Sequence, residues 1–345
     1  MARMDSHPRT VNERKLAHLR AIDDETVDLA QDSFARWKLA YQALPGIALD
    51  EVSTETTFAD RPIAAPLIIS CMTGGAGEPF VTINRRLAEA AEILRIPFGL
   101  GSMKVLLNRE DARASFALRE VAPSVPFIAN LGLVSFNYGV SLDHVRALVE
   151  ILRPDIFGFH LNALQEAIQW GGDTDFRGLR EALRSAVEGL PVPVYVKECG
   201  GGIHPRLVGE LLELGVRYVD LSGRDGTSWS AVETKLSPDP EFGVPFRDFG
   251  LPTSWMLEQL EPGLRWSGRI VASGGMRNGV QAVKALALGA DYVAMARPFM
   301  LAAKESTGAV VAVGRRFIRE MRTAMFLVGA ARLSEVKDHL VHREP

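Results

Sequence analysis

The sequence predicts an α/β protein, a (β/α)8 TIM barrel with an N-terminal helical extension. Eight short apolar runs, the first beginning at 66 and the last ending at 296, each end in a polar or glycine-rich cluster. Segments with helical apolar spacing separate most of these runs. Alternating buried strands and helices are typical of a parallel sheet, and in this barrel the functional residues lie at the C-terminal ends of the strands. One architecture therefore explains why polar clusters recur at the same end of each run.

The apolar runs predict strands at 66–71, 97–101, 126–131, 155–161, 192–197, 217–222, 269–273 and 291–296. Helical spacing predicts helices at 10–22, 32–44, 88–94, 112–121, 142–152, 179–190, 207–214 and 280–288. Residues 49–58 alternate between apolar and polar side chains, as an outer strand or a plug would. We expect an extension over 1–60 that covers a barrel over 61–335. The main competitor is a doubly wound sheet, but the usual third glycine is missing after Gly75 and Gly77.

Two further segments suggest packing or interface roles. The insert over 230–266 is long and proline-rich, as lids and subunit contacts often are. The tail after 298 reads as helix, and its large apolar residues at helical spacing predict packing or a subunit interface: Phe317, Met321, Met325 and Phe326.

The composition is that of an ordinary globular protein. The 345 residues are 47% hydrophobic and 23% charged, with a formal net charge of −3. This balance gives no reason to expect nucleic acid or an anionic membrane as a partner. The first twenty residues are polar, so we expect a cytoplasmic protein. Cys71 and Cys199 form no Cys-x-x-Cys pair and predict two buried, reduced thiols.

The seventh and eighth strand ends carry a phosphate-binding pattern. Ser273-Gly-Gly-Met-Arg277 and Ala296-Arg297 follow strands that should be neighbours. In this fold the two corresponding loops often form a phosphate cup. Glycine lets backbone N–H groups approach the oxygens, and a helix N-terminus adds partial positive charge.

Polar residues at the other strand ends would surround the rest of a ligand whose phosphate lies in this cup. They include Thr73, Gly74, Gly75, Ser102, Asn130, Lys197, Ser222 and Thr227. Asn130 suits the edge of a planar heterocycle, and Lys197 suits the electron-rich edge of a flavin. The alternative for Lys197 is a structural ion pair with Glu198 or Asp220, since lysine is seldom buried without a partner.

The fourth strand ends in His160-Leu-Asn-Ala-Leu-Gln-Glu166, where His160 and Asn162 share one face. A lone histidine in an apolar run is usually a core residue. Here, however, three further polar residues, Asn162, Gln165 and Glu166, follow the histidine at the barrel mouth. Glu166 with one amide oxygen is a poor all-protein metal site, yet it suffices for Mg²⁺ when a diphosphate and waters complete the shell.

The first helix carries Arg14, Lys15 and His18, with Arg14 and His18 one turn apart. These side chains form either a solvated basic face or a diphosphate clamp swung over the barrel mouth.

Together these clusters resemble one family, the flavin-dependent type 2 isopentenyl-diphosphate isomerases. The matching strings run in order along the chain: Arg14-Lys-Leu-Ala-His18, Met72-Thr-Gly-Gly75, Asn130-Leu-Gly132, His160-Leu-Asn-Ala-Leu-Gln-Glu166, Val196-Lys-Glu198, Gly226-Thr-Ser-Trp229 and Ala272-Ser-Gly-Gly-Met-Arg277.

The resemblance implies an FMN-dependent barrel enzyme, a homotetramer or larger, that interconverts isopentenyl and dimethylallyl diphosphate with Mg²⁺ and with NADPH as reductant. It implies an FMN site of Thr73, Gly74, Gly75, Ser102, Asn130, Lys197, Ser222, Thr227, Gly275, Arg277, Ala296 and Arg297. It implies substrate contacts from Arg14, Lys15, His18, Ser102, Lys104, His160 and Gln165, catalytic roles for Gln165, His160 and Asn162, and Glu166 as the Mg²⁺ ligand.

Three strings depart from the family pattern: Trp170-Gly-Gly-Asp173, Asp225-Gly-Thr227 and Ser102-Met-Lys104. Asp225 is the most serious, because a carboxylate about 6 Å from a phosphate charge costs roughly 3 kcal/mol at an effective dielectric of 20. Either Asp225 points away or the ligand differs from the usual one. The alternatives are an FMN enzyme for another prenyl diphosphate, an FMN-dependent 2-hydroxy-acid oxidase, and a non-catalytic flavin-binding protein.

Overall fold

The computed structural model describes residues 11–337 and 341–343, and its centre is a closed barrel of parallel strands. The eight strands follow one another around the barrel in sequence order, and the last pairs with the first. They are β4 (Leu67–Ile69), β5 (Phe98–Gly99), β6 (Phe127–Gly132), β7 (Ile156–Leu161), β8 (Val194–Glu198), β9 (Tyr218–Asp220), β10 (Ile270–Ala272) and β11 (Tyr292–Met295). Each lies within or overlaps one predicted strand, which confirms the TIM barrel and excludes the doubly wound sheet.

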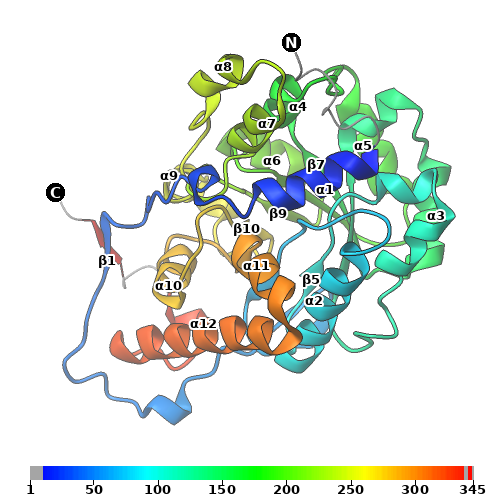
Figure 1. The fold of residues 1–345 in the computed structure, drawn as a ribbon. Helices are drawn as coiled ribbons and strands as arrows, with labels where there is room; N and C mark the ends of the chain where they lie inside the picture. The colour runs from blue at the N-terminus through cyan, green and yellow to red at the C-terminus, as the bar shows by residue number, and fades with distance from the viewer. Residues whose placement is uncertain (1–10, 338–340, 344–345) are drawn as a thin grey trace.

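Helices surround the barrel and cover its strands (Figure 1). They are α1 (Val11–Ala21), α2 (Phe80–Leu94), α3 (Leu142–Leu152), α4 (Ala163–Ile168), α5 (Leu179–Gly189), α6 (Pro205–Glu213), α7 (Trp229–Leu236), α8 (Pro240–Gly243), α9 (Thr253–Gln259), α10 (Gly279–Ala287), α11 (Arg297–Glu305) and α12 (Thr307–Leu327). Thr10, where we expected the first helix to begin, lies outside the described residues. The tail is helical as predicted, and Phe317, Met321 and Met325 are buried within this chain.

Two predicted helices are wrong. Residues 32–44 contain a turn and β1 (Trp37–Leu39), which pairs with β12 (Val341–Arg343) near the C-terminus. Residues 112–121 contain the end of a 3₁₀ turn (Glu110–Ser115) and then loop. There the Ser115 carbonyl accepts a hydrogen bond from Asn84 of α2 at 2.9 Å. In both segments long-range partners replaced the local helical bonds that the spacing suggested.

A short hairpin closes the N-terminal end of the barrel. It consists of β2 (Thr56–Phe58) and β3 (Arg61–Ile63). Phe58 and Ile63 are buried in one cluster with residues that line the inside of the barrel at this end, including Tyr218 and Tyr292. The Phe58 and Tyr218 rings stack with centroids 4.4 Å apart. The alternating segment that we expected to be an outer strand or plug therefore ends in an apolar plug.

The opposite end carries the N-terminal segment and the long insert. Helix α1 lies across the ends of the strands beside α7 (Figure 1). Residues 22–36, which we call the strap, continue from α1 along the loops that follow β9, β10 and β11. The insert after β9 folds into α7, α8 and α9. Within the described part of the chain, no helix is both long and apolar enough to cross a bilayer.

Candidate active site

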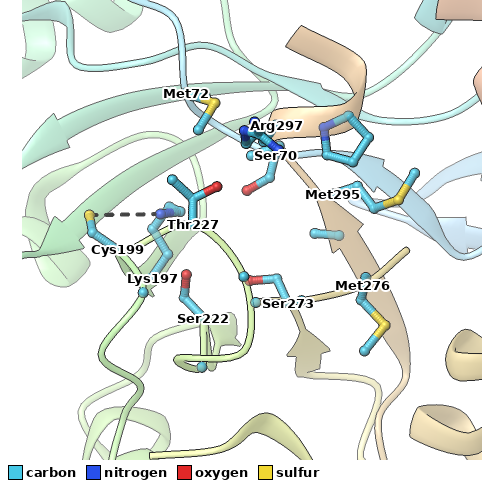
Figure 2. A pocket seen from close by; sticks show the side chains of 18 of the residues that line it. Ser70, Met72, Lys197, Cys199, Ser222, Thr227, Ser273, Met276, Met295 and Arg297 are labelled. Atoms are coloured by element: carbon cyan, nitrogen blue, oxygen red, sulfur yellow. Dashed lines mark hydrogen bonds between the residues drawn. The ribbon is translucent and has the colours of Figure 1, made fainter. Parts of the chain in front are cut away.

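A cavity of about 660 Å³ opens at the C-terminal ends of β4 and β8–β11 (Figure 2). The loop after β4 contributes Cys71 and Met72, and β8 contributes Lys197. The ends of the remaining strands contribute, among others, Ser222, Thr227, Ser273, Gly275 and Ala296. The cavity thus lies where a TIM barrel places its ligands.

Seven of the twelve predicted FMN residues line this cavity: Lys197, Ser222, Thr227, Gly275, Arg277, Ala296 and Arg297. The other five, Thr73, Gly74, Gly75, Ser102 and Asn130, follow β4 and β5 or lie on β6, outside its wall. Several of these residues contact one another or neighbouring elements. The Thr73 hydroxyl donates to the Asn84 side chain, and a Cβ on Gly74 would lie 2.7 Å from the Ser102 carbonyl oxygen.

The loops after β10 and β11 form a glycine-lined end of the cavity. Gly274 and Gly275 have φ of +87° and +77°. A Cβ on Gly275 would lie 2.4 Å from the Asp225 Cβ, so only glycine fits there. The N-cap of α11, Ala296, offers no side chain to its first turn, which leaves that helix end open toward the cavity. An anion is favoured at such a helix N-terminus.

The two arginines at this end are bound to the strap. Arg277 Nη2 donates to Asp28 Oδ1 at 2.7 Å, and Arg297 Nη1 donates to Asp28 Oδ2 at 3.3 Å. Their guanidinium groups are therefore not free cations directed only at a ligand. Sequence reasoning missed Asp28, because nothing local distinguishes it from the other acidic residues of 23–32.

Lys197 lies buried in the cavity wall, 5% exposed. Its Nζ donates to the backbone carbonyl of Glu198 at 2.5 Å and lies 3.9 Å from Cys199 Sγ (Figure 2). No carboxylate within the described residues forms a salt bridge with it, so the structural ion pair that we considered is absent. Burial lowers the pKa of Lys197, but the neighbouring acidic groups, Cys199 and Asp220 foremost, together raise it, and the net pKa lies above that of a free lysine. The cavity wall thus carries a cation at neutral pH.

Both cysteines are free thiols beside this cation. Burial raises the pKa of Cys71 to about 12 and that of Cys199 to about 11, although Lys197 lowers both. Both thiols therefore stay protonated at neutral pH, as inert cysteines do.

His160, at the end of β7, is a neutral imidazole. Its Nδ1 lies 3.2 Å from Asn130 Oδ1 on the neighbouring strand. Burial and the charges of Lys197, Lys15 and Lys104 hold its pKa well below the ordinary value. Three cations near a half-buried histidine indicate a site suited to an anion.

The residues after β7 form a network around two acidic side chains. Gln165 donates to Glu233 Oε1 at 2.8 Å, and Asn162 donates to Glu166 Oε1 at 2.6 Å. The Asn162 Oδ1 atom is buried without a partner. Burial raises the pKa of Glu166. Sequence reasoning missed Glu233, although a glutamate one turn into a helix after Gly226-Thr-Ser-Trp229 was a usable signal.

Helix α1 brings its basic side chains onto this network. His18 Nε2 lies 2.8 Å from Glu233 Oε1, and the two side chains are 6% and 3% exposed. Burial lowers the pKa of Lys15, which Glu233 and Glu166 partly restore. His18 and Lys15 therefore do not belong to a solvated basic face. They face the barrel mouth, as the clamp hypothesis expects.

Two of the sequence departures also find their place. Lys104 pairs with Asp173 at 2.7 Å. Asp225 is 2% exposed, and its Oδ2 accepts hydrogen bonds from Ser33 Oγ at 2.6 Å and from the Thr253 N–H at 2.9 Å. Its side chain therefore points away from the cavity toward the strap and α9. Of the two alternatives, the structure favours the first, since Asp225 is not among the residues that line the cavity.

Comparison with known proteins finds relatives over nearly the whole chain. Residues 188–343 match the FMN-dependent dehydrogenase family. The chain is 42% identical to an isopentenyl-diphosphate delta-isomerase of Paracoccus zeaxanthinifaciens, over 97% of this chain and 98% of that protein. It is 40% identical to one of Pseudescherichia vulneris, over 94% and 95% of the two chains.

Solved structures with lower identity share the fold. Flavocytochrome b2 superposes with a TM-score of 0.67 at 18% identity, covering 95% of this chain and 79% of that one. A soluble mutant of (S)-mandelate dehydrogenase from Pseudomonas putida superposes with a TM-score of 0.66 at 15% identity, covering 96% and 99%. The fold is thus shared more widely, whereas the full-length identities and the family match above show that the chain belongs to the type 2, FMN-dependent family of isopentenyl-diphosphate delta-isomerases.

Proposed function

We propose that this protein interconverts isopentenyl diphosphate and dimethylallyl diphosphate, with FMN reduced by NADPH and with Mg²⁺. The observation that carries the proposal is the cavity at the barrel mouth, with a glycine-lined anion site at one end, a buried lysine in its wall, and the cations of α1 near the network beside it. Membership of the family supports the same reaction. We further propose that it acts as a homotetramer or larger assembly.

The donor groups of the cavity fit FMN. The phosphate would lie against Gly275 and the open N-terminus of α11, where glycine backbone can approach the phosphate oxygens closely. Lys197 would face the electron-rich edge of the flavin ring, and Ser222 and Thr227 would hydrogen-bond along the cofactor. When bound and reduced, FMN supplies an electron-rich ring with an acid/base nitrogen. We keep Thr73, Gly74, Gly75, Ser102 and Asn130 as candidates for the rest of its site.

The substrate would lie between this cavity and α1. Arg14, Lys15, His18 and Lys104 would bind the diphosphate, and charge-assisted hydrogen bonds are the strong ones for such a group. Ser102, His160 and Gln165 complete the proposed contact set. A neutral His160 that donates its Nδ1–H to Asn130 Oδ1 keeps Nε2 as an acceptor and adds no charge near the reacting alkene.

The residues near Glu166 fit a metal that the substrate helps to hold. Among residues 11–337 and 341–343, no cluster of three His, Cys, Asp or Glu side chains is arranged to hold a metal alone. Glu166 does offer a carboxylate beside the unpartnered amide oxygen of Asn162. Mg²⁺ prefers this kind of site, with one or two oxygens from protein and the rest from phosphates and water.

The reaction moves a proton between two carbons with no net redox change. Protonation of an unactivated alkene creates a tertiary carbocation-like state, which needs nearby electron density and the exclusion of water. Helix α1 covers the mouth and limits access of water. Gln165 has no useful pKa, so we assign it an orienting role, fixed by Glu233.

The test is an anaerobic incubation of the purified protein with isopentenyl diphosphate, FMN, NADPH and Mg²⁺. We expect dimethylallyl diphosphate by mass spectrometry or NMR. Protein shown to hold FMN but forming no product would reject the isomerase. Lactate added to the protein with oxidised FMN, without NADPH, distinguishes a 2-hydroxy-acid oxidase, which would bleach the flavin. We expect no bleaching, because the loop after β9, Ser222-Gly-Arg-Asp225, provides no histidine base.

A further inference from the structure

The strap crosses the end of the cavity that we assign to the FMN phosphate, and it is tied to the loop after β9. The N–H of Leu29 donates to the Gly226 carbonyl at 2.9 Å, and the N–H of Ser228 donates to the Val27 carbonyl at 2.8 Å. Asp28 lies between these two bonds, forms a bridge with Thr227, and lines the cavity. The strap thus forms part of the cavity wall.

Asp28 joins two loops that follow different strands. Its carboxylate accepts from Arg277, after β10, and from Arg297, after β11. Oδ1 also accepts the backbone N–H of Ala30 at 2.8 Å, which fixes the turn of the strap. Ala30 has φ of +51°, an unusual value for a residue other than glycine. One side chain therefore holds both loops of the glycine-lined end and the shape of the strap.

Cations on the same two loops hold the rest of the strap and the end of α1. Arg277 Nη1 donates to the Gln31 carbonyl at 2.8 Å, and Arg297 Nε donates to the Ile22 carbonyl at 2.9 Å. Lys304, on α11, donates to the Leu19 carbonyl at 2.7 Å and pairs with Asp23. The helix whose N-terminus faces the phosphate end thus also holds the helix that carries Arg14, Lys15 and His18.

We propose that Asp28 is a positioning residue that latches the strap to the phosphate end of the cavity and so couples FMN binding to the placement of α1. This rests on the FMN part of the proposed function. A ligand phosphate and the latch order the same two loops, so each stabilises the other. Such coupling is reciprocal: FMN should order the strap, and loss of the latch should weaken the substrate clamp on α1 without removing any group that touches the substrate.

Hydrogen exchange of Asp28→Asn without ligand tests the latch itself. The matched control is Asp24→Asn, which makes the same change four residues earlier, where Asp24 pairs with Lys235 of α7 and its side chain is 43% exposed. We expect the amides of residues 22–36 to exchange about five- to tenfold faster in Asp28→Asn than in Asp24→Asn, a typical size for a coupling between sites. Equal exchange in the two variants would overturn the latch, whether or not the protein binds FMN.

FMN titration followed by exchange tests the coupling. Saturating FMN should slow exchange of residues 22–36 about fivefold in the parent protein and in Asp24→Asn, and less than about twofold in Asp28→Asn. Equal FMN-dependent protection in all three proteins would reject the coupling. If the parent protein fails to quench FMN fluorescence, the proposed function fails instead, and the ligand-free comparison still decides the latch.

Steady-state kinetics separates positioning from a general structural defect. With FMN saturating, we expect Asp28→Asn to raise KM for isopentenyl diphosphate about tenfold and to change kcat less than about threefold, as loss of uniform binding does. A fall in kcat with unchanged KM would contradict the proposal. Asp28→Glu keeps the charge, and its KM should therefore rise less than that of Asp28→Asn. If Asp28→Asn folds poorly, the same measurements on Asp28→Glu decide the question, since a longer carboxylate should give an intermediate KM and intermediate strap exchange.

Discussion

The two ends of the barrel are closed by different physical means. At the N-terminal end, the β2–β3 hairpin buries Phe58 and Ile63 against aromatic and aliphatic residues inside the barrel. At the C-terminal end, α1 and the strap bury Leu19, Ile22, Val27 and Phe34 in the main core. Unlike the hairpin, they are also tied down by ion pairs and by hydrogen bonds from cations, such as Arg277 and Arg297 to Asp28. Both closures come from the first 63 residues of the same chain.

The difference matches what each end does. Apolar burial is non-directional, and its stabilisation grows with the apolar area removed from water. It suits a permanent seal. Polar contacts near a surface contribute little net stability, because water replaces them at small cost. The comparison predicts large stability effects at the base and binding effects at the mouth.

The largest expected effect is at the base. Phe58→Ala should lower the free energy of unfolding by about 3–5 kcal/mol, the range for a fully buried phenylalanine, because Phe58 is 0% exposed and stacks on Tyr218. Phe249→Ala removes the same group from a site that is 62% exposed and should cost less than about 0.5 kcal/mol. Denaturant unfolding measures both. Equal losses would mean that the hairpin is not a stabilising plug.

The next effect is on cofactor binding at the mouth. Lys197→Met should weaken FMN binding about 10- to 100-fold, the size expected for one charge-assisted hydrogen bond, because Lys197 is the buried cation of the cavity wall. Fluorescence quenching of FMN gives the Kd. Lys235→Met, on the surface of α7, is the control and should leave the Kd unchanged. A Lys197 variant that binds FMN normally would remove this residue from the cofactor site.

A pH effect of intermediate size should come from His160. Its folded pKa lies well below the ordinary value of about 6.5, so below pH 6.5 the unfolded chain binds a proton that the folded chain does not. Stability from this residue is therefore complete above pH 6.5 and falls as pH drops, by up to about 1.4 kcal/mol per pH unit.

Unfolding of the parent protein and of His160→Gln between pH 7.5 and 5.5 isolates this contribution. The difference in stability between them should narrow toward acid pH. His144→Gln, at an exposed position on α3 where glutamine can keep the helix cap, provides the comparison. If the two variants show the same pH dependence, His160 is not held neutral by its surroundings.

The smallest stability effect should come from Lys104. Its pair with Asp173 is partly exposed, with side chains 31% and 26% accessible. Lys104→Met should therefore change unfolding by no more than about 1 kcal/mol. It should raise KM for the diphosphate several-fold, because a cation at the mouth is lost. A large loss of stability with an unchanged KM would reverse the contrast between base and mouth.

The barrel strands could be predicted from the sequence. The two helices that were predicted wrongly show the limit of prediction from local spacing. Within the strand run 155–161, the stretch 156–159 carries no polar side chain, and such runs are typical of strands buried on both faces. Residues 32–44 have helical spacing too, yet Ser33 binds Asp225 and Trp37 pairs in a sheet with Arg343. Short segments of this kind follow their long-range partners rather than their local pattern.

The candidate site divides in the same way. The sequence alone placed polar residues at one end of the strands, because strand polarity and loop position are local properties of each βα unit. Only the tertiary structure decided which of them share a cavity, that Asp225 points away, and that Arg277 binds Asp28 across 249 positions of the chain. A charge finds its partner by closeness in space, and periodicity carries no information about contacts at such separations.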